Sequence, residues 1–286
     1  MQIPETRYAK TVDGVHVAYQ VLGAGPTDIV YVPGWISNVE TNWDLGHHAA
    51  LFRGLAALGR LIVFDRRGSG LSDRPDRAES LALALGMNDL RAVLDAAKSE
   101  WPALFGYEDG GTLAAMYAAA FPDRLSALVL YTPLVKGRRS ADYPFRSSDE
   151  EIDDWIQRVD EGWGTDELTR WIVEGSAPGN KPDDVFVQSI AKWLRSCASP
   201  GAVQAIERML RDVDARPILP TISTPTLTMQ RTGNTYGSIS ETRYITDMIP
   251  GARFIELSGS EDPPNLGNVE ELVQAVEAFL AGLRRE

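Results

Sequence analysis

The chain has 286 residues, 44% of them hydrophobic and 24% charged, which is the composition of an ordinary water-soluble globular protein. Its formal net charge of −12 disfavours nucleic acids and anionic membrane surfaces as partners, because phosphate recognition depends on clustered lysine and arginine. No apolar run approaches the roughly 20 residues of a bilayer-spanning helix, and residues 1–10 lack the apolar core of a secretion signal. We therefore expect a cytoplasmic protein.

Cysteine and arginine usage narrows the chemistry further. The single cysteine, Cys197, allows neither an internal disulfide nor a zinc site built from thiolates, and we expect it to be buried and inert. Arginines cluster only in short pairs flanked by acids, such as Arg66–Arg67 and Arg138–Arg139, which we expect to be solvated surface. Nothing in the sequence requires a cofactor or a metal, and no pattern sets an oligomeric state.

The first third of the chain alternates strand and helix patterns. Residues 13–23 alternate apolar and polar side chains before a Gly-x-Gly-Pro turn, which predicts an antiparallel edge strand. Residues 28–34 and 60–68 hold short β-branched runs without alternation, as expected of strands buried on both faces. Helical patterns follow these strands over residues 47–58 and 84–97.

The alternation continues on both sides of one long interruption. Strand patterns occur at residues 103–106, 125–133, 223–233 and 252–259, and helical patterns at residues 110–122, 239–249 and 269–285. Strands that alternate with helices of this length imply an α/β fold with a mostly parallel sheet and helices on both faces.

The interruption, residues 136–215, is rich in tryptophan and acidic side chains and shows helical patterns but no convincing strand. We interpret it as a helical lid over the carboxyl ends of the strands, so that residues 1–135 and 216–286 form the core. Either a ligand site or the packing of the lid itself explains its tryptophans, which are Trp155, Trp163, Trp171 and Trp193.

Several short motifs stand at the ends of predicted strands. They are VPGW at residues 32–35, FDRRGSGLSDR at 64–74, FGYEDGG at 105–111 and AAAFPDRLSALVLY at 118–131. In this order they resemble the oxyanion loop, the Asp-x-Arg-Gly-x-Gly-x-Ser turn, the nucleophile elbow and the following helix of the α/β-hydrolase superfamily. The nearest likeness is to the hydrolase-like domains fused to some bacterial class III adenylate cyclases. The resemblance implies an α/β-hydrolase fold for nearly the whole chain outside the lid.

The resemblance also assigns three residues to the positions of a catalytic triad. Glu108 stands where the family has its nucleophile, Asn234 where it has its acid, and Asp262 where it has its histidine. Serine attack needs a hydroxyl and a base whose pKa lies near neutrality, and these positions supply neither. Some members use a carboxylate as the nucleophile, but they still need the histidine to activate water.

The oxyanion loop places two backbone donors close to Glu108. The N–H groups of Asp109 and of Trp35, beside Gly34, would form the surviving oxyanion hole, with the Trp35 side chain walling the pocket. The helix end lowers the pKa of the Glu108 carboxyl, whereas a nearby Asp262 raises it. If the donors prevail, the carboxylate fills the place of a substrate oxyanion; otherwise the two carboxyl groups share one proton as an acid–base couple.

We expect the other hydroxyl and imidazole groups of interest to be structural. His16 lies in a strand pattern and is expected to be a surface or sheet residue. His47 and His48 begin a helix just past the oxyanion loop, where we expect them to be exposed. Ser69 and Ser72 lie in a tight glycine-rich turn and are expected to satisfy its backbone groups.

Four functions stay open on this basis. The favoured one is a hydrolase-fold protein that has lost ordinary ester hydrolysis and binds a small neutral or cationic molecule under its lid. The second is an enzyme with rewritten chemistry, a hydrolase, lyase or cyclase, that uses Glu108 and Asp262 as nucleophile or as acid and base. The third is a divalent metal site that adds Glu261 to this pair, although three oxygen ligands are few. The fourth is an interaction module whose negative charge attracts a basic partner.

Overall fold

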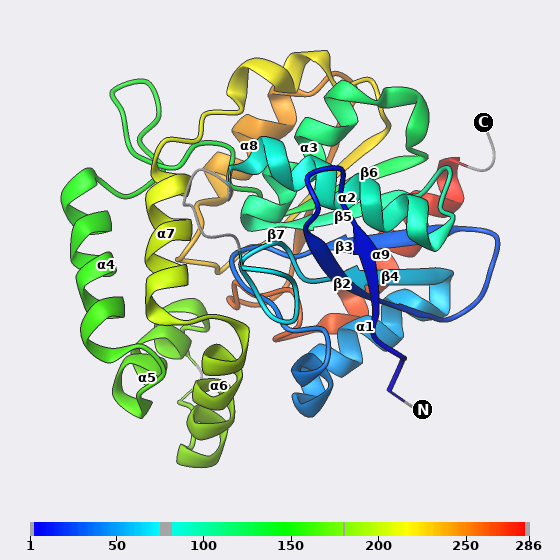
Figure 1. The fold of residues 1–286 in the computed structure, drawn as a ribbon. Helices are drawn as coiled ribbons and strands as arrows, with labels where there is room; N and C mark the ends of the chain where they lie inside the picture. Colours follow the sequence, from blue (N-terminus) through cyan, green and yellow to red (C-terminus); the bar gives the residue numbers. More distant parts are fainter. Residues whose placement is uncertain (1–2, 75–81, 180, 284–286) are drawn as a thin grey trace.

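The core of the protein is a single sheet. A computed structural model describes residues 3–74, 82–179 and 181–283, and in these ranges eight strands pair in the order β1-β2-β4-β3-β5-β6-β7-β8 (Figure 1). The strands are β1 (Arg7–Lys10), β2 (His16–Leu22), β3 (Asp28–Val32), β4 (Arg60–Phe64), β5 (Ala103–Tyr107), β6 (Ala127–Tyr131), β7 (Thr226–Arg231) and β8 (Arg253–Leu257). The β1–β2 and β2–β4 pairs are antiparallel and the other pairs are parallel. The predicted, mostly parallel sheet is confirmed.

The antiparallel edge of the sheet differs from the expectation. The predicted edge strand, β2, lies second from the edge, because β1 pairs outside it with Arg7 opposite Tyr19. A turn brings β1 into place, in which the Thr11 N–H donates to the Val15 carbonyl at 2.9 Å. Only one of the four β1 side chains is buried, so this strand lacks the apolar signal by which the others were found.

Helices cover both faces of the sheet, as predicted. α2, α3 and α8 pack on one face, with Leu90, Leu113 and Ile245 in its core, whereas α1 and α9 pack on the other with Leu55 and Phe279 (Figure 1). Their bounds are α1 (Gly46–Leu58), α2 (Leu83–Ala97), α3 (Glu108–Ala120), α8 (Ile239–Met248) and α9 (Val269–Leu283). The last two residues predicted for the closing helix, 284 and 285, lie outside the described ranges. No helix in those ranges is long and apolar enough to cross a membrane, and the cytoplasmic location stays a prediction.

Four α-helices lie between β6 and β7 in the described residues, within the segment predicted to be a lid, and are called the lid below after that prediction. They are α4 (Asp149–Gly162), α5 (Asp166–Ser176), α6 (Asp184–Cys197) and α7 (Pro200–Arg211). The residue before each of them accepts a backbone N–H of the first turn through its side chain; these caps are Ser148, Thr165, Asp183 and Ser199. Local sequence therefore determines where each lid helix begins.

The lid shares its apolar core with the loop that follows β3. Val159, Trp163 and Leu194 pack there with Ile36, a residue of that loop. The lid consequently lies at the carboxyl edge of the sheet, on the left in Figure 1. Cys197 is fully buried in the same core, as expected, and burial raises the pKa of its thiol well above the ordinary value. The division at residues 136 and 215 stays a prediction.

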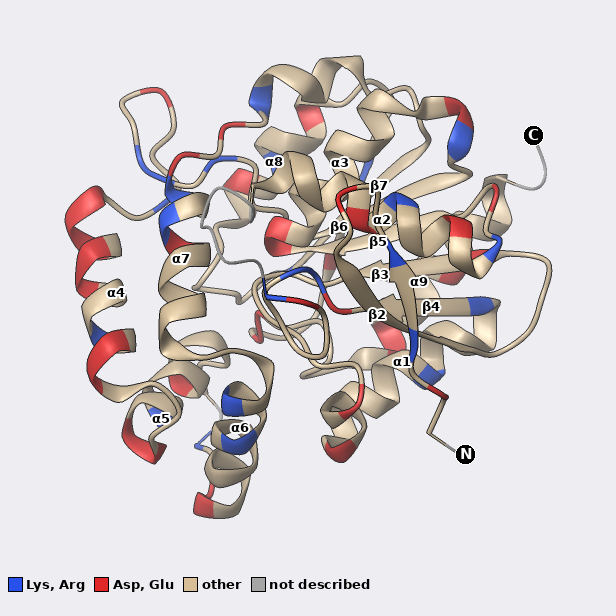
Figure 2. Cartoon of the chain, in the orientation of Figure 1, with Lys and Arg blue, Asp and Glu red and all other residues tan. Residues whose placement is uncertain are grey.

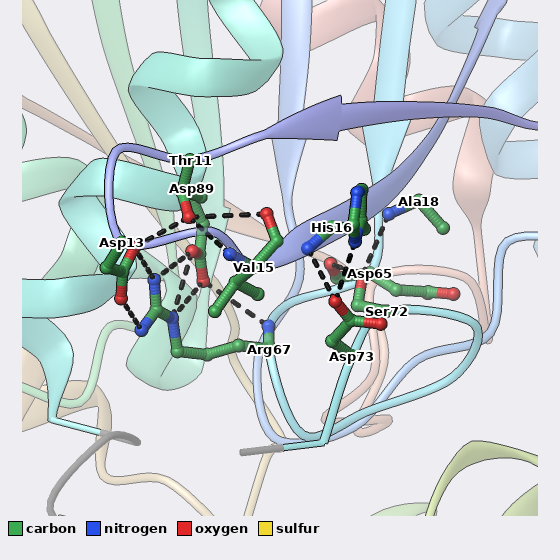
Figure 3. Close-up of polar contacts among 10 residues, drawn as sticks. All are labelled: Thr11, Asp13, Val15, His16, Ala18, Asp65, Arg67, Ser72, Asp73 and Asp89. Carbon is green, nitrogen blue, oxygen red and sulfur yellow. Dashed lines mark hydrogen bonds and ion pairs between the residues drawn. The ribbon is translucent and has the colours of Figure 1, made fainter.

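A buried ion cluster joins the turn after β4 to the first strands (Figure 3). The Arg67 guanidinium donates to Asp89 at 2.6 Å and to Asp13 at 2.8 Å. Arg67 is 4% exposed and Asp89 is fully buried, and neighbouring Arg66 is buried against Asp109. The expectation that Arg66 and Arg67 are solvated is therefore wrong. Their neutralising acids come from distant segments, which no local pattern reveals.

Serine hydroxyls organise the same turn. Ser69 Oγ donates to the Ser37 carbonyl at 2.9 Å and accepts the Ser37 N–H at 2.7 Å. Ser72 Oγ donates to the Asp65 carbonyl at 2.6 Å. The structural roles expected for both serines are confirmed, and His16 is an exposed residue of β2 as expected.

Replacing Arg67 by methionine should lower the free energy of unfolding by about 3–5 kcal/mol, because the buried Asp89 carboxylate loses its counter-charge. Arg138→Met is the matched control, since Arg138 pairs with Asp149 and Asp212 at the surface and such pairs contribute about 0–1 kcal/mol. Urea unfolding followed by circular dichroism compares both variants with the parent. Equal, small losses in the two variants would contradict the role assigned to the cluster.

Candidate functional site

Glu108 occupies a sharp bend between β5 and α3. Its φ angle is +46°, in the left-handed region that non-glycine residues rarely adopt. The bend needs glycines around it: a Cβ on Gly110 would lie 2.4 Å from the Val32 carbonyl oxygen, and one on Gly106 would lie 2.6 Å from the Gly111 Cα. A strand, a strained residue and a helix thus follow one another as in a nucleophile elbow, with a carboxylate at its tip.

Asp262 and Asn234 meet beside the elbow. Asp262 follows β8 and is 1% exposed. Its Oδ1 accepts the Asn234 Nδ2–H at 2.6 Å, and its Oδ2 accepts the Tyr107 hydroxyl at 2.7 Å. The sequence did not single out Tyr107, whose only signal was its place directly before Glu108. The structure therefore brings together the three positions expected to replace a triad and adds a phenol to them.

One small cavity joins these groups. Glu108 and Asp262 both line it. The volume open to the centre of a water molecule is about 10 Å³, which is room for about one water molecule. The other lining residues are Thr132, Pro133, Arg146, Gln230, Tyr236, Gly237, Glu241 and Thr242. Arg146 is held in the wall by its Nε–H, which donates to Glu241 at 2.7 Å.

Burial and like charge decide the state of Glu108. No residue in the described ranges donates a hydrogen bond to its carboxyl group. Burial raises the pKa of Glu108 well above its ordinary value, and repulsion from Asp262 and Asp109 raises it further, against the opposing charge of Arg146. Burial also raises the pKa of Asp262, but the bonds from Tyr107 and Asn234 favour its ionised form. Of the two carboxyl groups, Glu108 is therefore the one whose surroundings more strongly favour the protonated form.

The expected oxyanion hole is not open. The Trp35 N–H donates to Asp109 Oδ1, and the other oxygen of that carboxylate pairs with Arg66. The Trp35 indole lies against the lid, where its Nε1–H donates to Glu207 at 2.8 Å, and it does not line the Glu108 cavity. Gly34 packs closely against the elbow: a Cβ there would lie 2.4 Å from the carbonyl oxygen of Tyr107, the residue before Glu108. A donor expected to face a substrate is thus engaged by the side chain that follows the elbow.

The histidines near the lid are not exposed as predicted. His47 and His48 are half-buried where α6 covers the start of α1, and the His48 ring lies 5.2 Å from the Trp193 ring. Burial lowers the pKa of His47 to about 4 and that of His48 to about 3. The sequence could not show this, because the covering helix lies far along the chain. Neither ring lines the Glu108 cavity.

Comparison with known structures identifies the fold. A family model described as alpha/beta hydrolase fold matches residues 29–166. An esterase from Exiguobacterium antarcticum superposes with a TM-score of 0.83 at 22% identity, over 97% of this chain and 100% of that one. The bromoperoxidase from Bacillus anthracis gives the same TM-score and the same coverage at 20% identity.

The protein has the α/β-hydrolase fold. Among curated proteins, an uncharacterized protein of Mycobacterium tuberculosis is 36% identical over 128 residues, which are 44% of this chain and 35% of that protein. This chain thus matches about a third of the length of the first curated relatives. A pimeloyl-[acyl-carrier protein] methyl ester esterase of Chromobacterium violaceum is 24% identical over 91% of this chain and 96% of that protein.

A buried arginine positions Asp262 in this hydrolase fold. Arg231, at the end of β7, is fully buried, and its Nη1 donates at 3.1 Å to the carbonyls of Glu261 and Pro263, on either side of Asp262. The Glu261 side chain lies 3.9 Å from the Arg231 Nε. Within the described ranges no group of three His, Cys, Asp or Glu side chains is arranged to hold a metal ion, so the metal hypothesis gains no support. The only sequence signal for this role was an arginine at the end of a strand that is buried along its length.

Replacing Glu108 by glutamine in this hydrolase fold should stabilise the protein increasingly as pH rises. The folded chain keeps a proton on Glu108 that the unfolded chain loses above about pH 4.5, so rising pH favours unfolding of the parent until the folded-state pKa is reached. This effect reaches about 1.4 kcal/mol per pH unit at 25 °C, and glutamine abolishes it.

Thermal melts from about pH 5 to about pH 8 should show a growing difference in Tm between Glu108→Gln and the parent, which disappears near pH 4. Glu100→Gln, at an exposed position, is the control and should show no such trend. A difference that does not change with pH would contradict the raised pKa.

Proposed function

We propose that this α/β-hydrolase-fold protein does not hydrolyse esters by a hydroxyl–imidazole relay and that its Glu108 cavity binds a small molecule under the lid. Glu108, Asn234 and Asp262 stand at the positions of the family's triad, and the arrangement of a carboxylate elbow beside a second carboxylate supports this assignment. The likeness to hydrolase-like domains of adenylate cyclases stays a prediction.

The engagement of the Trp35 N–H by Asp109 is the observation that carries the proposal. Ester hydrolysis develops negative charge on the substrate oxygen, and backbone donors must be free to receive it. Here one donor already binds a carboxylate, and the Glu108 carboxyl stands beside it. An oxyanion at this place would meet two acidic side chains instead of a vacant pair of donors.

The surface charge of the lid favours a neutral or cationic ligand over an anionic one. Figure 2 shows acidic residues along α4 and α5, and the sequence of α4, DEEIDDWIQRVDEG, holds seven acids and one arginine. Such a surface repels anions and raises the local concentration of cations. The same charge supports the interaction-module hypothesis, in which a basic partner binds this surface.

The first test is hydrolysis of p-nitrophenyl acetate and p-nitrophenyl butyrate. The parent should release p-nitrophenol no faster than Glu108→Gln, because neither an attacking hydroxyl nor a free oxyanion hole is present. Absorbance assays over a range of enzyme concentrations measure this. Hydrolysis by the parent that Glu108→Gln abolishes would contradict the proposal.

Rebuilding the triad should restore some esterase activity, and more once the oxyanion donor is freed. The triple variant carries Glu108→Ser, Asn234→Asp and Asp262→His. Adding Asp109→Ala releases the Trp35 N–H, and Arg66→Met is included because an unpaired buried guanidinium destabilises the fold. The five-substitution variant should exceed the triple variant by about 10²–10³-fold in kcat. No activity in either folded variant would contradict the assignment of the three positions.

A second candidate function is proton transfer by the Glu108–Asp262 pair. Burial and the charge of Asp262 raise the pKa of Glu108, which accepts no hydrogen bond from the described residues, whereas Asp262 accepts bonds from Tyr107 and Asn234 that favour its charged form. Two carboxyl groups whose surroundings separate their protonation states are suited to serve as acid and base. A substrate with an acidic C–H beside a carbonyl would suit this pair.

Solvent exchange tests the second candidate without knowledge of the substrate. In D2O, small ketones such as 2-butanone should gain deuterium beside the carbonyl faster with the parent than with Glu108→Gln or Asp262→Asn, as measured by proton NMR. Exchange at the same rate in all three proteins would exclude this function for such ketones.

A further inference from the structure

Thr132 lines the Glu108 cavity, and its hydroxyl has no hydrogen-bond partner in the described residues. Thr132 is 5% exposed, and its Oγ1 is buried with no hydrogen-bond partner in the part of the chain that is described. Buried polar atoms are normally satisfied, so an orphaned hydroxyl on a cavity wall points to a missing ligand atom. Thr132 is not one of the three residues assigned to triad positions.

Thr132 mirrors Glu108 across neighbouring strands. Thr132 directly follows β6 as Glu108 directly follows β5, and these strands pair in parallel. Both residues have a positive φ, +42° for Thr132 and +46° for Glu108. A β-branched residue in this region is a true outlier, and such strain persists where the surroundings enforce it and often serves a site. The two strained residues present an acceptor each to the same cavity.

We infer that the cavity binds the ammonium group of a primary amine, held by the Thr132 hydroxyl and the carboxylates of Glu108 and Asp262. The inference rests on the proposed function and names its ligand class. A primary ammonium carries three N–H donors and no acceptor, which matches three acceptors on the wall. Asp262 keeps free lone pairs for this bond, because Tyr107 and Asn234 use one on each of its oxygens.

The size of the cavity fits an ammonium head and excludes a bulkier cation. It has room for about one water molecule, and an –NH₃⁺ group is of similar size. Tyr236 lines the cavity and is 62% exposed, so the wall reaches the protein surface at this residue. The carbon chain of the amine would leave past Tyr236, whose ring offers it an apolar surface. A quaternary ammonium is too large for this site and has no N–H donors.

The charges around Glu108 favour a cation. The charged groups that face it are Asp109 of α3, Glu207 of α7, Glu241 of α8, Asp262 after β8 and Arg146 before α4, and its titratable neighbours are the hydroxyls of Tyr31, Tyr107 and Tyr236. Arg146 is paired with Glu241 at 2.7 Å and Asp109 is paired with Arg66, so Glu207 and Asp262 are the carboxyl groups of this set without an ion-pair partner in the described residues. An ammonium group supplies the positive charge that this set lacks.

Binding releases one proton. The free protein holds a proton on Glu108; when R–NH₃⁺ enters, Glu108 gives this proton to solvent and its carboxylate pairs with the ammonium. No covalent bond forms or breaks beyond the O–H bond of the carboxyl group. Affinity should therefore rise with pH as long as the amine stays charged, up to about pH 10 for a lysine-like amine.

Isothermal titration calorimetry with n-butylammonium chloride tests the inference. Titrations near pH 7 in two buffers of different ionisation enthalpy give the number of protons released, which should approach one per amine bound. n-Butanol, of the same shape without the charge, and tetramethylammonium, a cation without N–H donors, are the ligand controls and should bind far more weakly.

Variants assign the site. Thr132→Val keeps the shape and the β-branch and should weaken butylammonium binding by about 10- to 100-fold, the effect of one hydrogen bond to a charged group. Thr132→Ser keeps the hydroxyl and should retain the affinity. Thr169→Val removes an equally buried, unpartnered hydroxyl in α5 and should change nothing. Glu108→Gln should abolish the proton release.

The outcomes separate this inference from the proposed function. Butanol binding as tight as butylammonium binding, unchanged affinity in Thr132→Val, or no butylammonium binding by the folded parent would each overturn the ammonium site. Turnover of p-nitrophenyl esters that depends on Glu108 would overturn the proposed function instead, whatever the amine does. Thermal melts establish that each variant is folded. If Thr132→Val does not fold, the inference is tested with the parent alone: butylammonium must bind more tightly than butanol and tetramethylammonium, and its binding must release a proton.

Discussion

Close backbone contact at the end of β5 is the constraint on which the site depends. The backbone at Gly110 lies against the carbonyls of Val32 and Pro33, and Gly34 lies against the Tyr107 carbonyl. A side chain at either glycine would force these segments apart. The contact holds Glu108 at a φ of +46° and fixes its carboxyl group on the wall of the cavity.

Two consecutive acids at this bend have opposite surroundings. Asp109 turns back toward the core and engages the Trp35 N–H and Arg66. Glu108 turns into the cavity, where burial and Asp262 oppose its charge. Two neighbouring carboxyl groups at the start of α3 therefore lie in different surroundings, one paired with donors and the other on the wall of the cavity.

The lid and the core meet at Asp262. The Asp262 N–H donates to the Ser176 carbonyl at the end of α5 at 2.7 Å, and Ser260 Oγ donates to the Pro178 carbonyl at 2.8 Å. From the end of β7 in the core, Arg231 donates to the carbonyls on either side of Asp262. The carboxylate that most strongly repels charge on Glu108 is therefore anchored partly by the lid. A displacement of α5 would change the separation of the two carboxyl groups and with it the protonation of Glu108.

The sequence by itself determined the alternation of strands and helices from β2 onward and the glycines of the bend at Glu108, and it predicted that Glu108 and Asp262 stand at the positions of a nucleophile and a histidine. These features depend on local periodicity and on steric limits that one stretch of chain expresses alone. Only the tertiary structure decided that Arg67 is buried, that His48 is covered, that the Trp35 N–H is engaged and that Thr132 lines the same cavity as Glu108. In each case the neighbouring group comes from a distant segment, and the energy of a buried charge or an unmade hydrogen bond depends on what surrounds it in space.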